Sequence, residues 1–549
     1  MDRFDSVDQT ADDAGEVRRH DPTLRGWRYY AVLFSLCFAL FLGAIDSSVV
    51  ATALVTIGAH FDEFVRLQWV VLAYLLVDLG EPAGSEDQSL NFTLTKPGFA
   101  LIFARVSDVI GRKWASIWAV AILTVGSLGA GLSTSINQLV IFRAIQGLGA
   151  AGVYSLPLTV IPEITPAELF GFVSAVSGLV FTCSSILGPT IGGVITTQSS
   201  WRWCFLFNVP CGGFAIAVML ATWPKQDIAG RITWSQLDFI GALLIIGTTV
   251  LTVFALQEAG SDTYAWSSPT IIGCLVGGAV AAIVFGAWIW FLSKKPRKIS
   301  PLFHTRVIKD RVLLGAFLIA MLSGYVLYVI LIELSERLQI VNSRTAQGAG
   351  IDLLPFLGSA AVSSGIAGFL SSGARNRSFE TITVFSAFTA LGCGLLAFVS
   401  KSATVPAALC GYQVILGFGI GGVLVSGTIV VKLTASQLDS ASAQGVQAQT
   451  RMLGGNLGLA IATIILNARL NVDLDGTLTP QQLSDLKRSL NSIGSLNPHQ
   501  VQAVSLSFAN AFRIQLVVCL GVAVVSLCCC AMIWQRNPRT FKDLKEAGG

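Results

Sequence analysis

The sequence has few charged residues for its length. Only 12% of its 549 residues are Asp, Glu, Lys or Arg, whereas 53% are hydrophobic, and the mean hydropathy is +0.68. A chain with so little polar surface cannot cover a water-soluble globule. The small net charge of +4 forms no basic face with interleaved aromatic residues, which argues against a nucleic-acid partner. We therefore expect the lipid bilayer to be its main solvent.

The sequence also lacks the groupings that indicate an enzyme or a metal protein. Its four histidines, at 20, 60, 304 and 499, lie outside the predicted membrane spans and belong to no Ser/His/Asp arrangement. Its 11 cysteines lie within predicted spans, so no disulfide framework or zinc spacing is implied. No G-x-x-x-x-G-K-[ST] loop is present, so ATP is not the direct energy source. We expect no enzymatic activity, no metal and no cofactor.

Apolar residues gather into blocks of about the length that crosses a bilayer. A spanning helix needs ~20 apolar residues, and these blocks are apolar on every face, unlike the alternating segments of a β-barrel. The sequence therefore predicts an all-α membrane protein. Its fourteen predicted spans are residues 30–54, 69–106, 114–133, 136–161, 169–196, 203–222, 237–257, 269–292, 312–332, 346–370, 380–399, 405–431, 444–467 and 511–534.

Basic residues predict the orientation of these spans. The densest basic run lies at 294–311, whereas the connections 134–135 and 259–268 contain no Lys or Arg. By the positive-inside rule both termini are then cytoplasmic. Residues 1–28 are polar and mixed in charge, which predicts a disordered cytoplasmic tail without a cleavable signal peptide.

The second predicted span is interrupted by a polar insert at 81–97 (EPAGSEDQSLNFTLTKP). Neither flank is long enough to span alone, and a polar linker at mid-bilayer would leave backbone groups unpaired at several kcal/mol each. Two hypotheses stay open: a gene-model artefact such as a retained intron, or an insertion looped into an aqueous cavity. The insert contains the sequon Asn91-Phe92-Thr93, so Asn91 is a candidate glycosylation site.

Residues 104–113 (ARVSDVIGRK) form a charged loop after the second span. They resemble the G-x-L-x-D-R-x-G-R-K signature of the major facilitator superfamily. That resemblance implies a gating latch in which Asp108 sits against a helix end of the opposite half, and Arg112 and Lys113 offer charge partners after Gly111. Alanine and valine stand at signature positions usually occupied by Gly and Arg, which predicts a weaker latch.

Span four places an arginine among apolar residues, at Arg143 in residues 139–150 (LVIFRAIQGLGA). A charge at mid-helix costs at least ~2.5–3.5 kcal/mol, so Arg143 must face a cavity or a carboxylate. The segment resembles the proton-antiporter signature l-x-x-x-R-x-x-q-G-x-g-a at every signature position, including Gln146 and Gly147.

The candidate partner of that arginine is Asp46, in residues 42–54 (LGAIDSSVVATAL) of span one. This segment resembles the first-helix motif of fourteen-span drug:H⁺ antiporters, although Val55 stands where that motif ends in proline. An aspartate in a cavity beside an arginine can exchange a proton as solvent access changes. We therefore predict proton coupling and the substrate cavity at Asp46, Arg143, Gln146 and Gly147. A purely structural ion pair between spans one and four is the alternative.

Span five contains a run of small residues, SSILGPTIGG at 184–193. It resembles the antiporter signature g-x-x-x-G-P-x-x-G-G, which is associated with export in the superfamily, with a serine in place of the first Gly. Small residues let helices approach closely, and Pro189 removes a backbone hydrogen bond. Gly188, Pro189, Gly192 and Gly193 are thus predicted to form a pliable packing seam.

The resemblance covers nearly the whole chain and is strongest to fungal-type toxin and multidrug efflux transporters of the fourteen-span drug:H⁺ antiporter family. It implies a major facilitator fold in which spans seven and eight are an added central pair. The expected domains are a cytoplasmic tail at 1–28, an N-terminal six-helix half at 29–222 that includes the insert at 81–97, two extra spans with a cytoplasmic loop at 223–311, a C-terminal six-helix half at 312–534, and a cytoplasmic tail at 535–549.

The expected function is secondary active export of small amphipathic organic molecules such as toxins, drugs or secondary metabolites, by proton antiport. The alternatives are an uptake transporter of the same fold for a nutrient or an iron chelate, or a non-transporting membrane sensor. We expect a monomer in the plasma membrane, with the vacuolar membrane as the alternative location.

One feature of the C-terminal half departs from the family pattern, and a second residue there has two possible roles. Span nine ends in Glu333, Glu336 and Arg337, where relatives are usually apolar and aromatic. Arg451, near the inner end of span thirteen, lies in a segment that resembles the family. It could act in transport or extend its charge to the membrane surface.

Overall fold

The computed structural model describes most of the predicted spans. The described residues are 26–61, 67–77, 111–165, 170–223, 238–261, 264–294, 310–371, 377–399, 405–435, 440–488, 496–536, residue 538 and single positions between 103 and 110. The insert at 81–97 with Asn91, the latch residue Asp108 and most of both predicted tails lie outside them.

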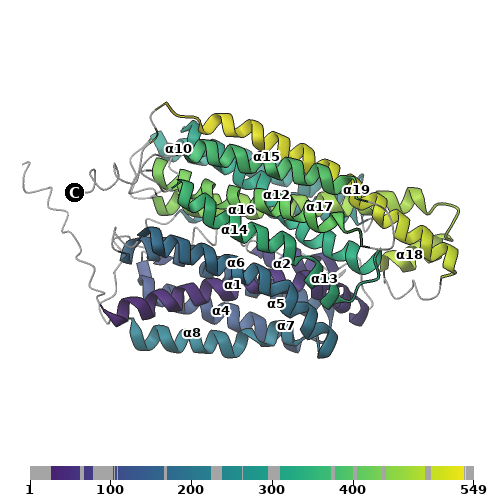
Figure 1. The fold of residues 1–549 in the computed structure, drawn as a ribbon, viewed down its shortest axis with the longest axis horizontal. Helices are drawn as coiled ribbons and strands as arrows, with labels where there is room; N and C mark the ends of the chain where they lie inside the picture. Colours follow the sequence, from purple (N-terminus) through teal and green to yellow (C-terminus); the bar gives the residue numbers. More distant parts are fainter. Residues whose placement is uncertain are drawn as a thin grey trace, which may run out of the picture.

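The N-terminal part of the chain folds into one group of long helices (Figure 1). Apolar residues on every face form these helices, because a bilayer leaves the backbone no hydrogen-bond partners outside the helix. They are α1 (Trp27–Phe61), α2 (Leu67–Val77), α4 (Arg112–Leu132), α5 (Ile136–Ile164), α6 (Phe170–Gln198), α7 (Trp203–Leu206) and α8 (Asn208–Thr222).

The C-terminal part forms a second group, which lies above the first in Figure 1. Its helices are α12 (Arg311–Ile340), α13 (Ala346–Asp352), α14 (Leu354–Ser371), α15 (Ser378–Ala397), α16 (Ala408–Thr434), α17 (Ser440–Asp473), α18 (Pro480–Arg488) and α19 (Pro498–Cys529), followed by a short 3₁₀ helix, η4 (Cys530–Ile533). α1 begins and η4 ends at the same end of the molecule, the end that the sequence predicts to be cytoplasmic. We call the opposite end the outer end.

The all-helical membrane fold is confirmed. Among the described residues, 12 helices are long and apolar enough to cross a bilayer, and no strand occurs there. α6 is also of spanning length, at 29 residues. α2 has only 11 residues, and the remainder of predicted span two falls largely outside the described part. The count of fourteen therefore stays a prediction.

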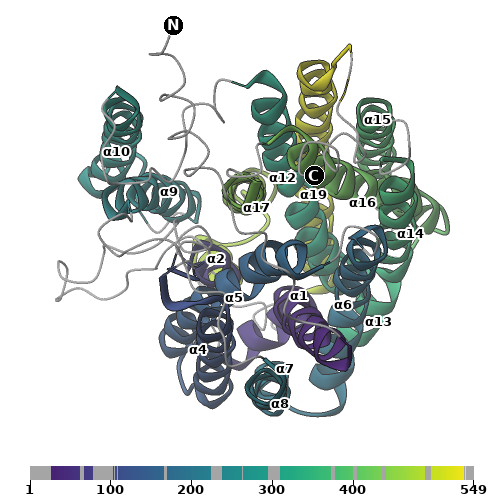
Figure 2. The same cartoon turned by 90° about the vertical axis from the view of Figure 1, so that its left-hand side faces the viewer.

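Two helices stand apart from both groups. α9 (Phe239–Gly260) and α10 (Pro269–Lys294) pack on each other beside α2 and α17 (Figure 2). Trp69 Nε1 donates a 2.6 Å hydrogen bond to Glu258 Oε1, and Asn467 Nδ2 donates a 2.8 Å bond to the Gly260 carbonyl. These two bonds attach the pair to α2 and α17, while most of α10 faces outward.

The outer connection between spans thirteen and fourteen is more helical than the sequence analysis expected. α17 continues to Asp473, α18 follows, and α19 already begins at Pro498. Gln500 Oε1 accepts from the Asn497 backbone N–H at 3.1 Å, which caps the start of α19. Leucines spaced along one side of α17 pack with α18 and α19 into a small apolar cluster, which includes Leu470, Leu474, Leu486, Val504 and Phe508. This packing stabilises helical turns between the predicted spans 444–467 and 511–534.

Candidate functional site

Asp46 on α1 and Arg143 on α5 form a buried ion pair. Arg143 Nη1 lies 2.8 Å from Asp46 Oδ2, and the two side chains are 1% and 0% exposed respectively. Two charges removed from water are tolerated only when their remaining donors and acceptors are also satisfied. The surroundings of the pair therefore decide what it can do.

Amide side chains complete the hydrogen bonds of the aspartate. Gln146 Nε2 donates to Asp46 Oδ1 at 2.7 Å, and Asn208 Nδ2 donates to the same oxygen at 2.8 Å. Both amides also donate to Ser127 Oγ, at 2.6 and 3.2 Å. Together with Arg143, three donors converge on one carboxylate, brought there from α5 and α8.

The arginine is held from a third side by α2. Its Nε donates to the Val70 carbonyl at 3.1 Å, and a second Nη1 bond goes to Gln146 Oε1 at 2.8 Å. The guanidinium carbon lies 4.0 Å from the centroid of the Tyr74 ring, a cation–π contact that favours the charge of this buried side chain. The ring is fixed because Tyr74 donates through its hydroxyl to the Gly43 carbonyl at 3.1 Å.

One acceptor in this network has no partner among the described residues. Asn208 Oδ1 is buried and receives no hydrogen bond from them, which is costly in a low-dielectric interior. If Asp46 took up a proton it would become a donor, and a rotated Asn208 amide could accept that proton's hydrogen bond. The network thus has a hydrogen-bond arrangement available for each of the two states of the acid.

The predicted coupling residues lie together, and the sequence analysis missed others beside them. Gln146 bridges the pair directly, whereas Gly147 is buried in α5 without a polar role. Ser127, Tyr74 and Asn208 were not predicted as part of the site. The only signal for Asn208 was its place at the start of predicted span six, and neutral residues such as Ser127 leave no charge to be explained.

The predicted latch is only partly described. Gly111 has φ of +92°, a conformation that residues with a Cβ adopt at a cost, so glycine suits this position at the start of α4. Arg112 is 8% exposed and its Nη1 donates to Ser107 Oγ. Lys113 is half-buried on α4. Because Asp108 lies outside the described residues, the latch itself stays a prediction.

The small residues of α6 pack against two different helices. A Cβ on Gly188 would meet Ser48, and one on Gly192 would lie 2.5 Å from the Val49 carbonyl oxygen, so both glycines contact α1. The Pro189 carbonyl also accepts a hydrogen bond from Thr52 Oγ1 on α1 at 3.1 Å. These contacts hold α6 and α1 together within the N-terminal group.

Gly193 contacts the other group of helices. A Cβ there would lie 2.6 Å from the carbonyl oxygen of Ala346 on α13, and a Cβ on Gly350 would lie 2.5 Å from the Pro189 carbonyl oxygen. α6 and α13 therefore meet backbone to backbone at the outer end, a separation that only glycine permits. The outer ends of the two groups are closed against each other in this structure.

Gly193→Ala is expected to weaken that closure. The added methyl would overlap backbone atoms of Ala346, which cannot rotate away, and overpacking of this kind costs about 1–3 kcal/mol. Spin labels on Gln198 and Arg344 should then show a longer outer distance by double electron–electron resonance. Gly213→Ala is the matched control, because nothing lies within 4 Å of that Cβ. An unchanged distance distribution in Gly193→Ala would contradict the packing described here.

The acidic residues at the end of span nine also lie inside the protein. Glu333 is 5% exposed, and its Oε2 accepts a 2.9 Å hydrogen bond from Gln515 Nε2 on α19. Arg337 Nη1 donates to Asn342 Oδ1 at 3.3 Å. This departure from the family pattern therefore contributes a buried polar cluster to the C-terminal group.

Comparisons with known proteins agree with these features. Residues 36–351 match the Major Facilitator Superfamily. The chain is 31% identical over 536 residues to "MFS-type transporter FPY5" of Fusarium mangiferae, covering 95% of this chain and 86% of that protein. It is 28% identical to "Efflux pump dotC" of Dothistroma septosporum, covering 94% and 86%.

A solved structure has the same fold. It is a bacterial homologue of the human lysosomal transporter Spinster in an inward-facing, unoccupied conformation. The TM-score is 0.60 at 15% sequence identity, covering 93% of this chain and 100% of that one. At this identity the likeness concerns the fold alone.

Proposed function

We propose that this chain, which belongs to the major facilitator superfamily, exports small amphipathic organic molecules by proton antiport. Its membership follows from a family match over more than half of its length, and its 12 described spanning helices make it an integral multi-pass membrane protein. Export is supported by relatives named as efflux pumps and by the Gly-Pro-x-x-Gly-Gly segment of α6. Toxins, drugs and secondary metabolites are the proposed substrates.

The proton site of this proposal is Asp46, and the buried Asp46–Arg143 contact is the observation that supports it most directly. A proton arriving on Asp46 would remove the negative charge that holds the guanidinium. Arg143 would then exchange its 2.8 Å ion pair for its bonds to Val70 and Gln146 alone. A change of charge is thereby converted into a change of contact between α1 and α5.

Protonation of Asp46 can affect the packing of α6, because Asp46 and the residues that contact α6 all lie on α1. Asp46 lies on the same helix as Val49 and Thr52, which pack against the small residues of α6. α6 in turn meets α13 at the outer end. We propose that protonation from the outer side accompanies closure of the contact between α6 and α13. Proton release to the inner side would accompany the opening of that contact. The plasma membrane is the proposed location, with the vacuolar membrane as the alternative, and a monomer is the proposed working unit.

The experiment is efflux from proteoliposomes that contain the purified full chain. A panel of apolar fluorescent compounds is followed while a pH gradient is imposed and then collapsed with nigericin in potassium buffer. We expect gradient-dependent movement of at least one compound to stop when the gradient is removed. Movement at an unchanged rate after collapse would exclude proton antiport, and movement in the uptake direction alone would favour the nutrient-importer alternative.

A further inference from the structure

Arg451 lies at the middle of the membrane-spanning region. Its backbone carbonyl packs directly against Gly324, where a Cβ would overlap it. Gly324 is near the midpoint of the 30-residue helix α12, roughly 20 Å from the nearer helix end at ~1.5 Å per residue. A 30-residue helix is ~45 Å long and extends past both faces of a ~30 Å hydrocarbon layer, so its midpoint lies near the centre of that layer. An arginine at this depth is too far inside to place its charge at the membrane surface.

The Arg451 charge has no acidic partner in the described part of the chain. Its Nε is buried, and no described residue forms a hydrogen bond or an ion pair with it. Arg143, by contrast, is fully paired with Asp46. An arginine stays protonated, and a charge at this depth is very unfavourable without a partner. With no acid beside it among the described residues, Arg451 is suited to bind an anion.

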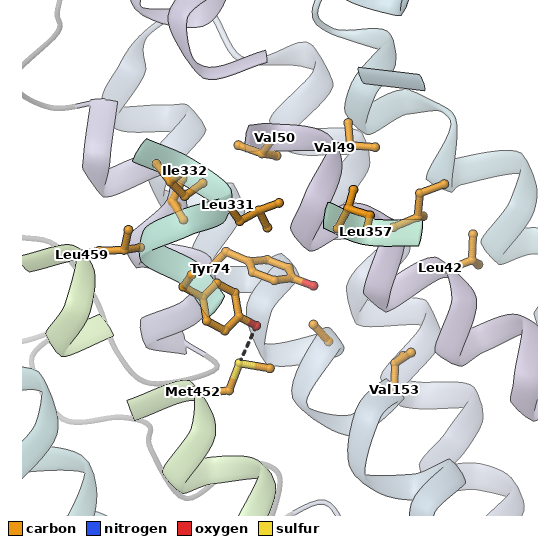
Figure 3. Close-up of a cluster of buried hydrophobic side chains, with 14 of the residues drawn as sticks. Leu42, Val49, Val50, Tyr74, Val153, Leu331, Ile332, Leu357, Met452 and Leu459 are labelled. Atoms are coloured by element: carbon orange, nitrogen blue, oxygen red, sulfur yellow. Dashed lines mark hydrogen bonds between the residues drawn. The ribbon is translucent and has the colours of Figure 1, made fainter. Parts of the chain in front are cut away.

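Arg451 lies at a level of α17 where the two groups of helices meet. Met452, the next residue, belongs to one apolar cluster with Leu331 on α12 and with Tyr74 on α2 and Val153 on α5 of the N-terminal group (Figure 3). Alternating access must open a path between these two groups of helices.

The helices that meet at this level carry apolar and aromatic side chains. Tyr328 donates a 3.0 Å hydrogen bond to Met452 Sδ, drawn as the dashed line in Figure 3. Tyr74, Leu331 and Ile332 lie beside this contact in the same cluster. One cation among apolar side chains matches a molecule with an apolar ring and one acidic group, since a guanidinium binds a carboxylate through two parallel hydrogen bonds.

We propose that Arg451, at the level of α17 where the two groups of helices meet, binds the acidic group of the transported molecule, so that the substrates include amphipathic organic anions. The identity of this ligand as cargo rests on the proposed export function. The anion site itself rests on the unpaired cation, its depth and its place between the two groups of helices. The site is distinct from the Asp46–Arg143 centre, where the cation is already neutralised.

Binding of two matched probes to the purified full chain tests the proposal. 2-Naphthoate and 2-naphthamide share one ring system and differ in charge. We expect the wild type to bind naphthoate about tenfold more tightly than naphthamide, the size of effect that a charge-assisted hydrogen bond gives. Arg451→Gln should lose that preference while still binding naphthamide. Arg451→Lys should retain part of the preference for naphthoate. If the glutamine variant does not fold, the smaller preference of Arg451→Lys relative to the wild type provides the test.

Arg469→Gln is the control, because this arginine lies on the same helix but is 44% exposed and 3.8 Å from Asp473. Its preference for naphthoate should match the wild type. Equal affinity for the two probes in the wild type, no binding of either, or an undiminished preference in Arg451→Gln would overturn the proposal. Binding needs no transport, so gradient-driven efflux without an anion preference would reject the anion site alone. Anion binding at Arg451 without gradient-driven efflux would reject the export function alone.

Discussion

Asp46→Asn is expected to abolish efflux driven by a pH gradient while leaving the protein folded. Asparagine keeps the size of the side chain and can still contact Arg143 and Gln146, but it cannot take up or release a proton. In proteoliposomes the gradient-dependent rate should fall to that of empty vesicles. Exchange of labelled for unlabelled compound, which needs no net proton movement, should continue.

Asp473→Asn is the matched control for this substitution. Asp473 is an acid at the outer end of α17, 20% exposed and 3.8 Å from Arg469, and a surface pair of this kind contributes only ~0–1 kcal/mol. Loss of the Asp473 charge should leave efflux unchanged. Wild-type dependence on the pH gradient in Asp46→Asn would remove Asp46 from the coupling mechanism.

Arg143→Ala is expected to have the largest effect on stability. It leaves Asp46 buried without its cation and removes the packing on Tyr74, and breaking one side of a buried pair costs about 3–5 kcal/mol. The thermal midpoint of the purified protein should fall sharply, and efflux should cease.

A double variant separates the coupling role from a structural one. Asp46→Asn with Arg143→Gln removes both charges and retains amide hydrogen bonds, so most of the lost stability should return. If the pair acts in coupling, this stable double variant still shows no gradient-driven efflux. If it transports like the wild type, the pair only holds α1 to α5. Wild-type efflux in Arg143→Ala alone would lead to the same conclusion.

The helices and the central ion pair could be predicted from the sequence for a simple reason. Apolar blocks such as 136–161 can be stable only in lipid, and a charge such as Arg143 within one of them demands a partner. Asp46 was the candidate acid in a neighbouring span, and the structure brings the two side chains into contact. Strong energetic requirements of this kind can be recognised without knowledge of how the helices pack.

The rest of the site depends on packing directions that one sequence does not specify. Asn208 and Ser127 are neutral, so nothing in the sequence requires them to face Asp46. The glycines of α6 were predicted as one seam, yet Gly192 faces α1 and Gly193 faces α13, because neighbouring residues on a helix point in different directions. The depth of Arg451 likewise became clear only from its contact with the middle of α12.

Proton movement measured together with substrate movement tests the central claim most directly. Vesicles containing the full chain and the pH-sensitive dye pyranine are given an outward-directed substrate gradient without an initial pH gradient. If Asp46 exchanges a proton during transport, substrate movement should change the internal pH in the wild type and in Asp473→Asn but not in Asp46→Asn. Substrate movement in the wild type without any pH change, or an equal pH change in Asp46→Asn, would contradict this account.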